Sequence, residues 1–222
     1  CEIVRDVLCL CEEKIRAGMT TKELDKIAYD YITSCGATPS FLGYGGFPAA
    51  TCISIDEQVV HGFPSDRIIE EDQIVSVDVG AFFNGFHGDA ARSLYVGHIS
   101  PEKKKLIDVT RECFFEGIKG ICIGSALGDI GAQVQEHAEK NGFSVVRDMV
   151  GHGVGRHLHE DPSVPNYGKR GVGVRLKRNM TIAVEPMINM GGYEVDIDGW
   201  KCVTSDGKPS AHYENTVLIG DN

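Results

Sequence analysis

Five side chains that can bind a divalent cation lie within short apolar or glycine-rich segments of this 222-residue chain. Four are carboxylates and one is an imidazole: Asp78, Asp89, His152, Glu185 and Glu214. Removing an ionised carboxylate from water is costly unless a cation or a hydrogen-bonding partner compensates it. Four acids carry more negative charge than one divalent ion neutralises. We therefore predict two adjacent ions that share bridging carboxylates, an arrangement suited to hydrolytic chemistry.

The first two acids belong to a predicted β-hairpin. Strand-like runs at 73–83 and 86–96 are joined by Asn84-Gly85, the preferred dipeptide for a two-residue turn. Pairing across that turn places Asp78 and Asp89 on one face, diagonal to each other, while the odd positions from 75 to 83 form the apolar face. Diagonal neighbours lie about 7 to 8 Å apart, within reach of two ions about 3.5 to 4 Å apart. The alternative for this motif alone is a pair of solvated acids on an edge hairpin.

The other three donors occupy different backbone settings. His152 stands between two glycines, so the backbone there can take unusual angles and nothing bulky blocks the ring. Glu185 has apolar neighbours, and Pro186 prevents further ladder bonding on that side. Glu214 opens a final apolar strand. Taken singly, each segment has an alternative interpretation. His152 would be a structural histidine in a turn, and Glu185 and Glu214 would be surface charges on edge strands.

The overall pattern predicts one α+β domain over residues 1–222. Helical patterns are expected from the start of the chain to Gly18, after a capping box at 20–23, from Pro101 to about Lys119, and over 126–140; a strand is expected at 51–55. This order favours a mixed, largely antiparallel sheet with helices covering one side. The chain opens at Cys1 within a helical pattern, and we expect native residues to precede it.

Composition restricts the function classes. A net charge of -10 and a pI near 5.2 argue against a nucleic-acid binder. Charges near the start are incompatible with a signal peptide, and we expect no membrane span. The eight cysteines include no C-x-x-C pair and favour buried, reduced thiols and a cytoplasmic location.

Four segments together closely resemble the type I methionine aminopeptidases: residues 75–93, 150–168, 181–189 and 210–219. The resemblance extends over nearly the whole chain, with successive donors separated by 11, 63, 33 and 29 residues. It implies the pita-bread fold, a pseudo-two-fold arrangement with the site between its halves. It also implies removal of N-terminal methionine from peptides and nascent proteins whose second residue is small.

The resemblance assigns each donor a place. Asp78 is expected to bind one ion, Asp89 and Glu214 to bridge both, and His152 with Glu185 to complete the second. The donor set suits Mn, Fe or Co, and Ni or Zn stay open as well. Backbone carbonyls near three residues are expected to hold a monovalent cation: Asp56, Gln58 and Ser210.

Roles in catalysis and substrate binding are also expected, and those of the two histidines and of the pocket residues come from the resemblance. Glu185 is the candidate general base, His159 is expected to contact the scissile carbonyl and the oxyanion, and His61 the amide of the second residue. Tyr44, Phe47, Cys52 and Trp200 are expected to surround the substrate's first side chain, since a thioether packs well against aromatic rings. The chain departs from the common family pattern where Phe41 replaces a cysteine and Leu158 a phenylalanine, which puts the pocket's shape in doubt. Five histidines receive no role: 87, 98, 137, 157 and 212.

Two other functions stay open. A proline-directed exopeptidase of the same fold would cleave X-Pro peptides, although such relatives usually carry a further N-terminal domain. A non-catalytic pita-bread module would bind nascent chains without turnover. Expected partners are peptide or nascent-protein N-termini and the ribosome, with no direct nucleic-acid or membrane contact, and the chain is expected to be a monomer.

Overall fold

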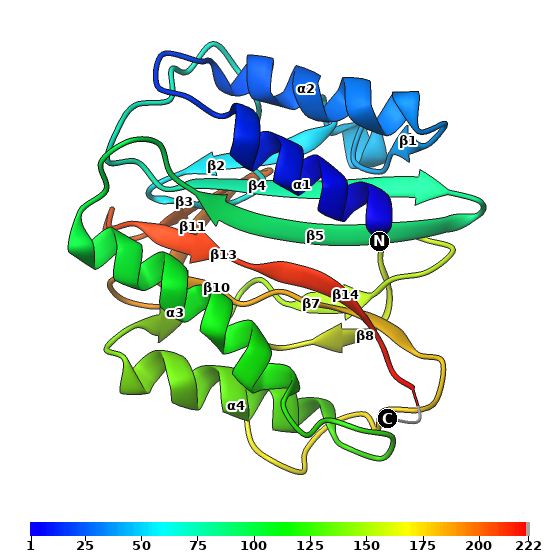
Figure 1. Cartoon of the computed structure of the whole chain (residues 1–222). Coiled ribbons are helices and arrows are strands. Elements are labelled where there is room, and N and C mark those ends of the chain that lie inside the picture. Colours follow the sequence, from blue (N-terminus) through cyan, green and yellow to red (C-terminus); the bar gives the residue numbers. More distant parts are fainter. Residues whose placement is uncertain (221–222) are drawn as a thin grey trace.

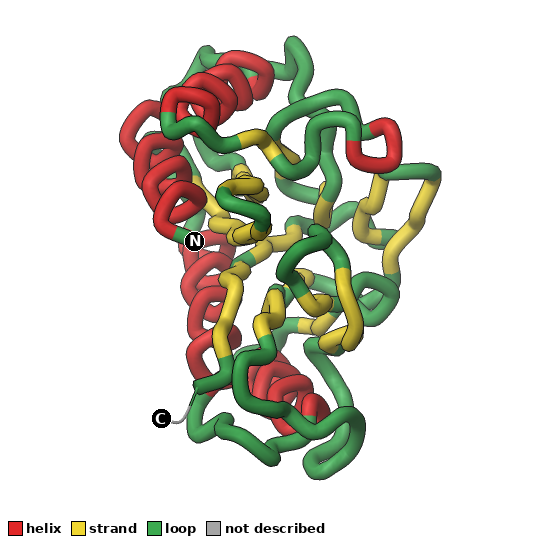
Figure 2. The backbone as a smooth tube through the Cα atoms, turned by 90° about the vertical axis from the view of Figure 1, so that its right-hand side faces the viewer, coloured by secondary structure: helices red, strands yellow, loops and turns green. Residues whose placement is uncertain are grey.

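The structure is a computed structural model that describes residues 1–220 (Figure 1). Two pairs of helices pack against a central sheet: α1 (Glu2–Lys14), α2 (Thr21–Ser34), α3 (Pro101–Ile118) and α4 (Leu127–Lys140). Figure 2 shows most helical residues on one side of the strands and most loops on the other. The loop-bearing side is therefore the side left open for a site.

The largest sheet has eight strands in the order β1-β4-β5-β14-β9-β7-β8, with β2 also paired to β4. Their bounds are β1 (Thr38–Pro39), β2 (Thr51–Ile55), β4 (Val75–Phe83), β5 (Phe86–Leu94), β7 (Gly151–Gly153), β8 (Glu160–Val164), β9 (Thr181–Val184) and β14 (Glu214–Leu218). All pairings between these strands are antiparallel. The expected α+β fold with a largely antiparallel sheet is confirmed.

Two small antiparallel sheets flank the large one. One joins β6 (Ser144–Val145), β10 (Met187–Asn189) and β13 (Ser210–His212); the other joins β3 (Gln58–Val60), β11 (Val195–Asp198) and β12 (Lys201–Thr204). A single 3₁₀ turn, η1 (Tyr44–Gly46), interrupts the loop before β2. The first of these small sheets packs against α3 and α4.

The chain builds two similar halves around separate apolar cores. The first core joins α1 and α2 to β4, and the second joins α3 and α4 to β9 and β10. The halves meet in the large sheet where β5 pairs with β14. Any site built on both of these strands therefore depends on the contact between the halves.

The hairpin of β4 and β5 has the predicted register. Phe83 pairs with Phe86 across the Asn84-Gly85 turn, and Gly80 pairs with Asp89. Both turn residues have positive φ, 51° and 84°, as the favoured hairpin turn requires. Val75, Val77, Val79 and Ala81 pack into the first core, so Asp78 lies on the opposite face. The predicted apolar face ends there, because Phe83 is exposed at the end of the hairpin.

The helix boundaries follow the predicted signals except at one end. The Thr20–Glu23 capping box opens α2, and Pro101 is the first residue of α3. The first helix ends at Lys14, not at Gly18, because Ile15 already has an extended backbone. Gly18 instead donates its N–H to the carbonyl of Ile69, so its positive φ belongs to the turn that follows.

The cysteines differ in their exposure. Cys11, Cys52, Cys113 and Cys202 are buried, whereas Cys1, Cys9 and Cys122 are exposed; all eight are free thiols. The expectation that the thiols are buried thus holds only for part of the set. Within residues 1–220, no helix is long and apolar enough to cross a membrane.

Candidate metal centre

The open face of the large sheet carries a row of carboxylates. Asp78 on β4 pairs with Ala91 on β5, and Ala91 pairs in turn with Glu214 on β14. Asp89 lies two residues before Ala91 on the same face of β5. The small Ala91 side chain between the two outer acids leaves space in the middle of the row.

The remaining two predicted donors come from the second half. His152 is the central residue of β7, and Glu185 follows directly after β9, which pairs with β14. Pro186 ends that strand, as predicted, and Met187 begins β10 in a different sheet. At this break the Glu185 side chain turns toward His152, and its carboxylate lies 3.6 Å from Nε2 of that histidine.

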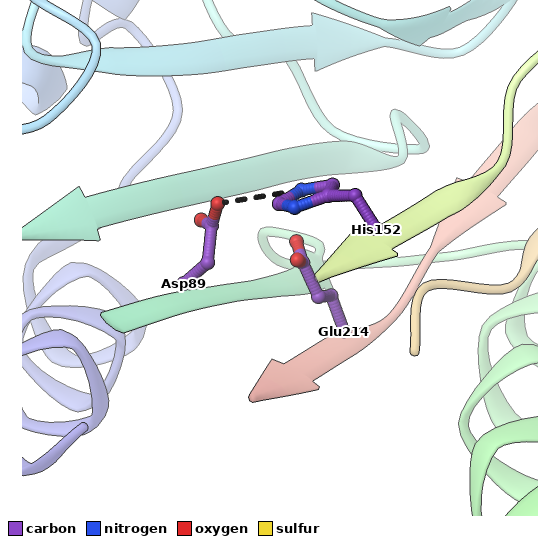
Figure 3. Close-up of side chains that lie close together, drawn as sticks. All are labelled: Asp89, His152 and Glu214. Atoms are coloured by element: carbon purple, nitrogen blue, oxygen red, sulfur yellow. Dashed lines mark ion pairs between the residues drawn. The ribbon is translucent and has the colours of Figure 1, made fainter. Parts of the chain in front are cut away.

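Three of the side chains point toward one another from β5, β7 and β14 (Figure 3). Nε2 of His152 lies 3.9 Å from Oδ2 of Asp89. One potential ligand atom from each of Asp89, His152 and Glu214 lies within 4.8 Å of the others, close enough to surround one cation. The imidazole Nδ1–H of His152 donates to the carbonyl of Gly153 over 2.8 Å, which leaves the Nε2 lone pair free to bind a metal.

The four carboxylates are strongly desolvated. Asp89 is only 3% exposed and Glu214 only 2%. Burial, reinforced by neighbouring acids, raises the pKa values of Asp78, Glu185 and Glu214 well above normal. Burial also raises the pKa of Asp89 to about 7. A nearby cation is the direct way to keep these groups ionised at neutral pH.

The donor atoms fit divalent cations. Oδ1 of Asp78, Oδ1 of Asp89 and Oε1 of Glu214 are buried and have no hydrogen-bond partner within the described part of the chain. Buried polar atoms without partners are rare in proteins, and such atoms commonly bind a water molecule or an ion. Carboxylate oxygens with an imidazole nitrogen suit first-row divalent metals.

The sequence reasoning missed one histidine in this cluster. His212, on β13, is 2% exposed, and its Nε2 lies 3.6 Å from Oε2 of Glu185 and 4.0 Å from Oε2 of Glu214. A second group of potential ligands is formed by Glu185, His212 and Glu214. Burial lowers the pKa of His212 to about 3, so the imidazole is neutral. Its position two residues before Glu214 in the sequence was the only available signal.

The two histidines expected to act on the substrate border the same cavity. His159 lies beside His152, with ring centroids 4.1 Å apart, and His61 contacts the ring of Trp200 edge-on at 5.5 Å. Burial is the main cause that lowers the pKa of His159 to about 4 and also lowers that of His61. His61 has a φ of 60°, a strained angle for a side-chain-bearing residue. Both imidazoles are therefore neutral and face one space.

That space is a cavity of about 180 Å³ with a carboxylate end and an apolar end. Its lining includes every residue predicted for divalent-metal binding, substrate binding or catalysis: Tyr44, Phe47, Cys52, His61, Asp78, Asp89, His152, His159, Glu185, Trp200 and Glu214. Phe47 packs edge-on against Trp200 at 5.3 Å. An elongated substrate could thus place an apolar side chain among these rings and a polar group at the acids.

The two departures from the family pattern lie in the same apolar wall. Phe41 and Leu158 are buried and pack with Phe47 and Cys52. A Cβ at Gly80 would come within 2.7 Å of the Phe41 ring, so glycine in β4 is what lets this ring lie over the strand. These two exchanges therefore alter the apolar wall of the pocket and not the carboxylates.

The metal-free chain should lose stability as the pH rises from about 4 to 7. The folded-state pKa of Asp89, about 7, lies above its ordinary value of 3.8, so the folded chain holds protons that the unfolded chain releases. This contribution is complete below pH 4 and falls by about 1.4 kcal/mol per pH unit for each such carboxyl. Urea unfolding of chelator-treated protein at several pH values measures it. The Asp89→Asn variant should show a shallower decline, and rising stability across this range would contradict the assignment.

Replacing His212 by Leu should weaken divalent-metal binding about 10- to 100-fold, as loss of a group next to metal ligands typically does. His212→Gln keeps an N–H donor and should weaken it less. Calorimetric titration with Mn²⁺ measures affinity and stoichiometry, and His98→Gln, on a loop outside the cavity, is the control. Equal affinity and stoichiometry in the Leu variant would show that His212 only fills space.

Comparison with known proteins agrees with this geometry. Residues 1–221 match metallopeptidase family M24. The chain is 54% identical to a methionine aminopeptidase of Clostridium perfringens, over 100% of this chain and 90% of that protein. It is 46% identical to methionine aminopeptidase 1 of Bacillus subtilis, over 94% and 85% of the two chains.

Solved structures show the same fold. The methionine aminopeptidase of Rickettsia prowazekii superposes with a TM-score of 0.97 at 39% identity, covering 99% of this chain and 90% of that one. A prolidase of Pyrococcus furiosus superposes with a TM-score of 0.79 at 24% identity, covering 100% of this chain and 59% of that one, and shares the fold alone. The chain belongs to metallopeptidase family M24 and, within it, to the methionine aminopeptidases.

Proposed function

We propose that this chain removes the N-terminal methionine from peptides and nascent proteins whose second residue is small. The observation that best supports this proposal is the single cavity in which buried acids and neutral imidazoles adjoin an aromatic pocket. The relatives named as methionine aminopeptidases support the choice of methionine.

The five predicted donors would hold two divalent ions. Asp78 would bind one ion, Asp89 and Glu214 would bridge both, and His152 with Glu185 would complete the second. When bound, such a pair of ions lowers the pKa of a water molecule and polarises a substrate carbonyl. Co, Mn, Fe, Ni and Zn all suit this donor set.

The aromatic end of the cavity would receive the methionine side chain. Tyr44, Phe47 and Trp200 offer ring faces and edges, and the Cys52 thiol is buried beside them. A thioether is polarizable and gains from contacts with aromatic rings. Packing of this side chain would fix the first peptide bond next to the acids.

The polar groups at the other end would handle protons and charge. Glu185 has two carboxylate oxygens, so one could bind an ion while the other takes a proton from the attacking water. His159 would donate a hydrogen bond to the scissile carbonyl as negative charge develops on its oxygen. His61 would contact the amide of the second residue. Each imidazole is neutral and has one N–H to donate.

Several finer features belong to the same proposal. The N–H of Ser210 donates to the carbonyl of Asp56, and the side chain of Gln58 accepts from Ile55, so the residues expected around a monovalent cation lie near one another. New N-termini emerge from the ribosome in the cytoplasm, which is where we place the activity. A monomer is sufficient, since both halves of the cavity come from one chain.

A peptide comparison tests the proposal. The metal-loaded protein should release methionine from Met-Ala-Ser and should leave Ala-Pro-Ser intact, because the cavity has an apolar end for a long first side chain. Asp89→Ala should abolish turnover and the binding of the second ion, as measured by chromatography and calorimetry. Cleavage of Ala-Pro-Ser alone would favour the proline-directed alternative. A folded, metal-loaded protein that is inert toward both would favour a binding module.

His159→Ala should lower kcat by about 100-fold or more, as removal of an oxyanion donor typically does. Metal binding should stay unchanged because this residue is not among the proposed ligands. Steady-state kinetics on Met-Ala-Ser, paired with calorimetric metal titration, separates the two effects. Unchanged turnover would remove the role assigned to His159, and lost metal binding would make it a structural support for His152.

A further inference from the structure

We propose that Tyr44 is a positioning residue for catalysis: its hydroxyl donates a hydrogen bond to Nδ1 of His159 and thereby keeps the imidazole hydrogen on Nε2. The inference rests on the proposed function, because it concerns the hydrogen that His159 would offer to the substrate oxygen. It gives Tyr44 a task beyond lining the methionine pocket.

The contact itself is well defined. The hydroxyl oxygen of Tyr44 lies 2.8 Å from Nδ1 of His159, and the two rings are tilted by 37° with centroids 5.1 Å apart. The residues are 115 positions apart in the sequence and come from opposite halves of the chain. Within residues 1–220, this is the only hydrogen bond of the His159 side chain.

The chemistry of the partner decides the tautomer. A neutral imidazole has one N–H and one lone pair, and a group on one nitrogen selects which nitrogen carries the hydrogen. Nδ1 of His152 faces the carbonyl of Gly153, which can only accept, so Nε2 of His152 keeps its lone pair. Nδ1 of His159 faces a hydroxyl, which can donate and so leave the hydrogen on Nε2.

The two adjacent imidazoles therefore have opposite requirements and different partners. A metal ligand needs a lone pair, which the Gly153 carbonyl secures for His152. A donor to an oxyanion needs a hydrogen, which the Tyr44 hydroxyl secures for His159. A neutral imidazole has only one hydrogen to place, so the partner at Nδ1 of His159 decides whether Nε2 can donate.

The loop around Tyr44 holds the hydroxyl in place. The N–H of Tyr44 donates to the carbonyl of Phe41, and its carbonyl accepts from the N–H of Phe47, both over 2.9 Å. Gly45 has a φ of 53°, and a Cβ there would lie 3.1 Å from the ring of Trp200. The indole thus packs directly on the loop backbone, which limits the movement of the tyrosine.

A tautomer role and a pocket role predict different measurements. If Tyr44 only contacted the methionine side chain, loss of its hydroxyl would act mainly on KM. If it selects the tautomer, the loss leaves binding in place and lowers the fraction of enzyme with a hydrogen on Nε2, which lowers kcat.

The direct test is nitrogen-15 NMR of the histidine side chains in protein loaded with diamagnetic Zn²⁺, with His159→Gln used to assign the resonances. In the unaltered chain, Nδ1 of His159 should appear unprotonated and Nε2 protonated. In Tyr44→Phe, the two shifts should move toward each other as both tautomers become populated. A protonated Nδ1 in the unaltered chain, or unchanged shifts in Tyr44→Phe, would overturn the proposal.

Kinetics on Met-Ala-Ser provide the second measurement. Tyr44→Phe should lower kcat about tenfold, the loss expected for one hydrogen bond, while KM stays within about twofold. Tyr29→Phe, which removes a hydroxyl from the exposed side of α2, should change neither constant. A change confined to KM would leave Tyr44 as a pocket residue only.

The two proposals fail in distinguishable ways. If the unaltered protein does not release methionine, the proposed function is wrong, while the NMR shifts still decide which nitrogen of His159 carries the hydrogen. If methionine is released and Tyr44→Phe is as active as the unaltered chain with unchanged shifts, only the tautomer proposal is wrong.

Discussion

Repulsion among four carboxylates that share one desolvated cavity is the constraint on which this structure depends. Asp78 and Asp89 come from the first half of the chain, whereas Glu185 and Glu214 come from the second. The halves join through β5 and β14, the two strands that carry Asp89 and Glu214. Without cations the acids would oppose the contact that brings them together, so metal binding and the packing of the halves are coupled through the same residues.

Sequence reasoning succeeds where structure depends on local rules. The Asn84-Gly85 turn fixes the hairpin register, and the register alone determines that Asp78 and Asp89 share a face. It fails where placement depends on distant pairing. His212 approaches Glu185 because β13 pairs with β10, and nothing in the local sequence around either strand encodes that contact. The predicted end of α1 at Gly18 was also wrong, because a glycine in the turn after a helix gives the same sequence signal as a glycine that ends the helix.

In the buried imidazoles, burial determines the charge of the ring, and hydrogen bonding determines which nitrogen carries the hydrogen. Burial keeps His61, His152, His159 and His212 neutral, which prevents them from adding positive charge that would compete with cations. Their differences then come from neighbours that the fold supplies. A carbonyl faces Nδ1 of His152, a hydroxyl faces Nδ1 of His159, and Nε2 of His212 has no hydrogen-bond partner within residues 1–220.

The two departures from the family pattern change side-chain volume in the pocket wall in opposite directions. Phenylalanine at 41 is larger than the cysteine frequent there, and leucine at 158 is smaller than the frequent phenylalanine, while both side chains are buried in the same apolar cluster. Compensating exchanges of this kind conserve volume, which apolar clusters tolerate better than a single change. Gly80 gives the Phe41 ring its space over β4. The pocket therefore changes in shape more than in size, and the carboxylate end is left undisturbed.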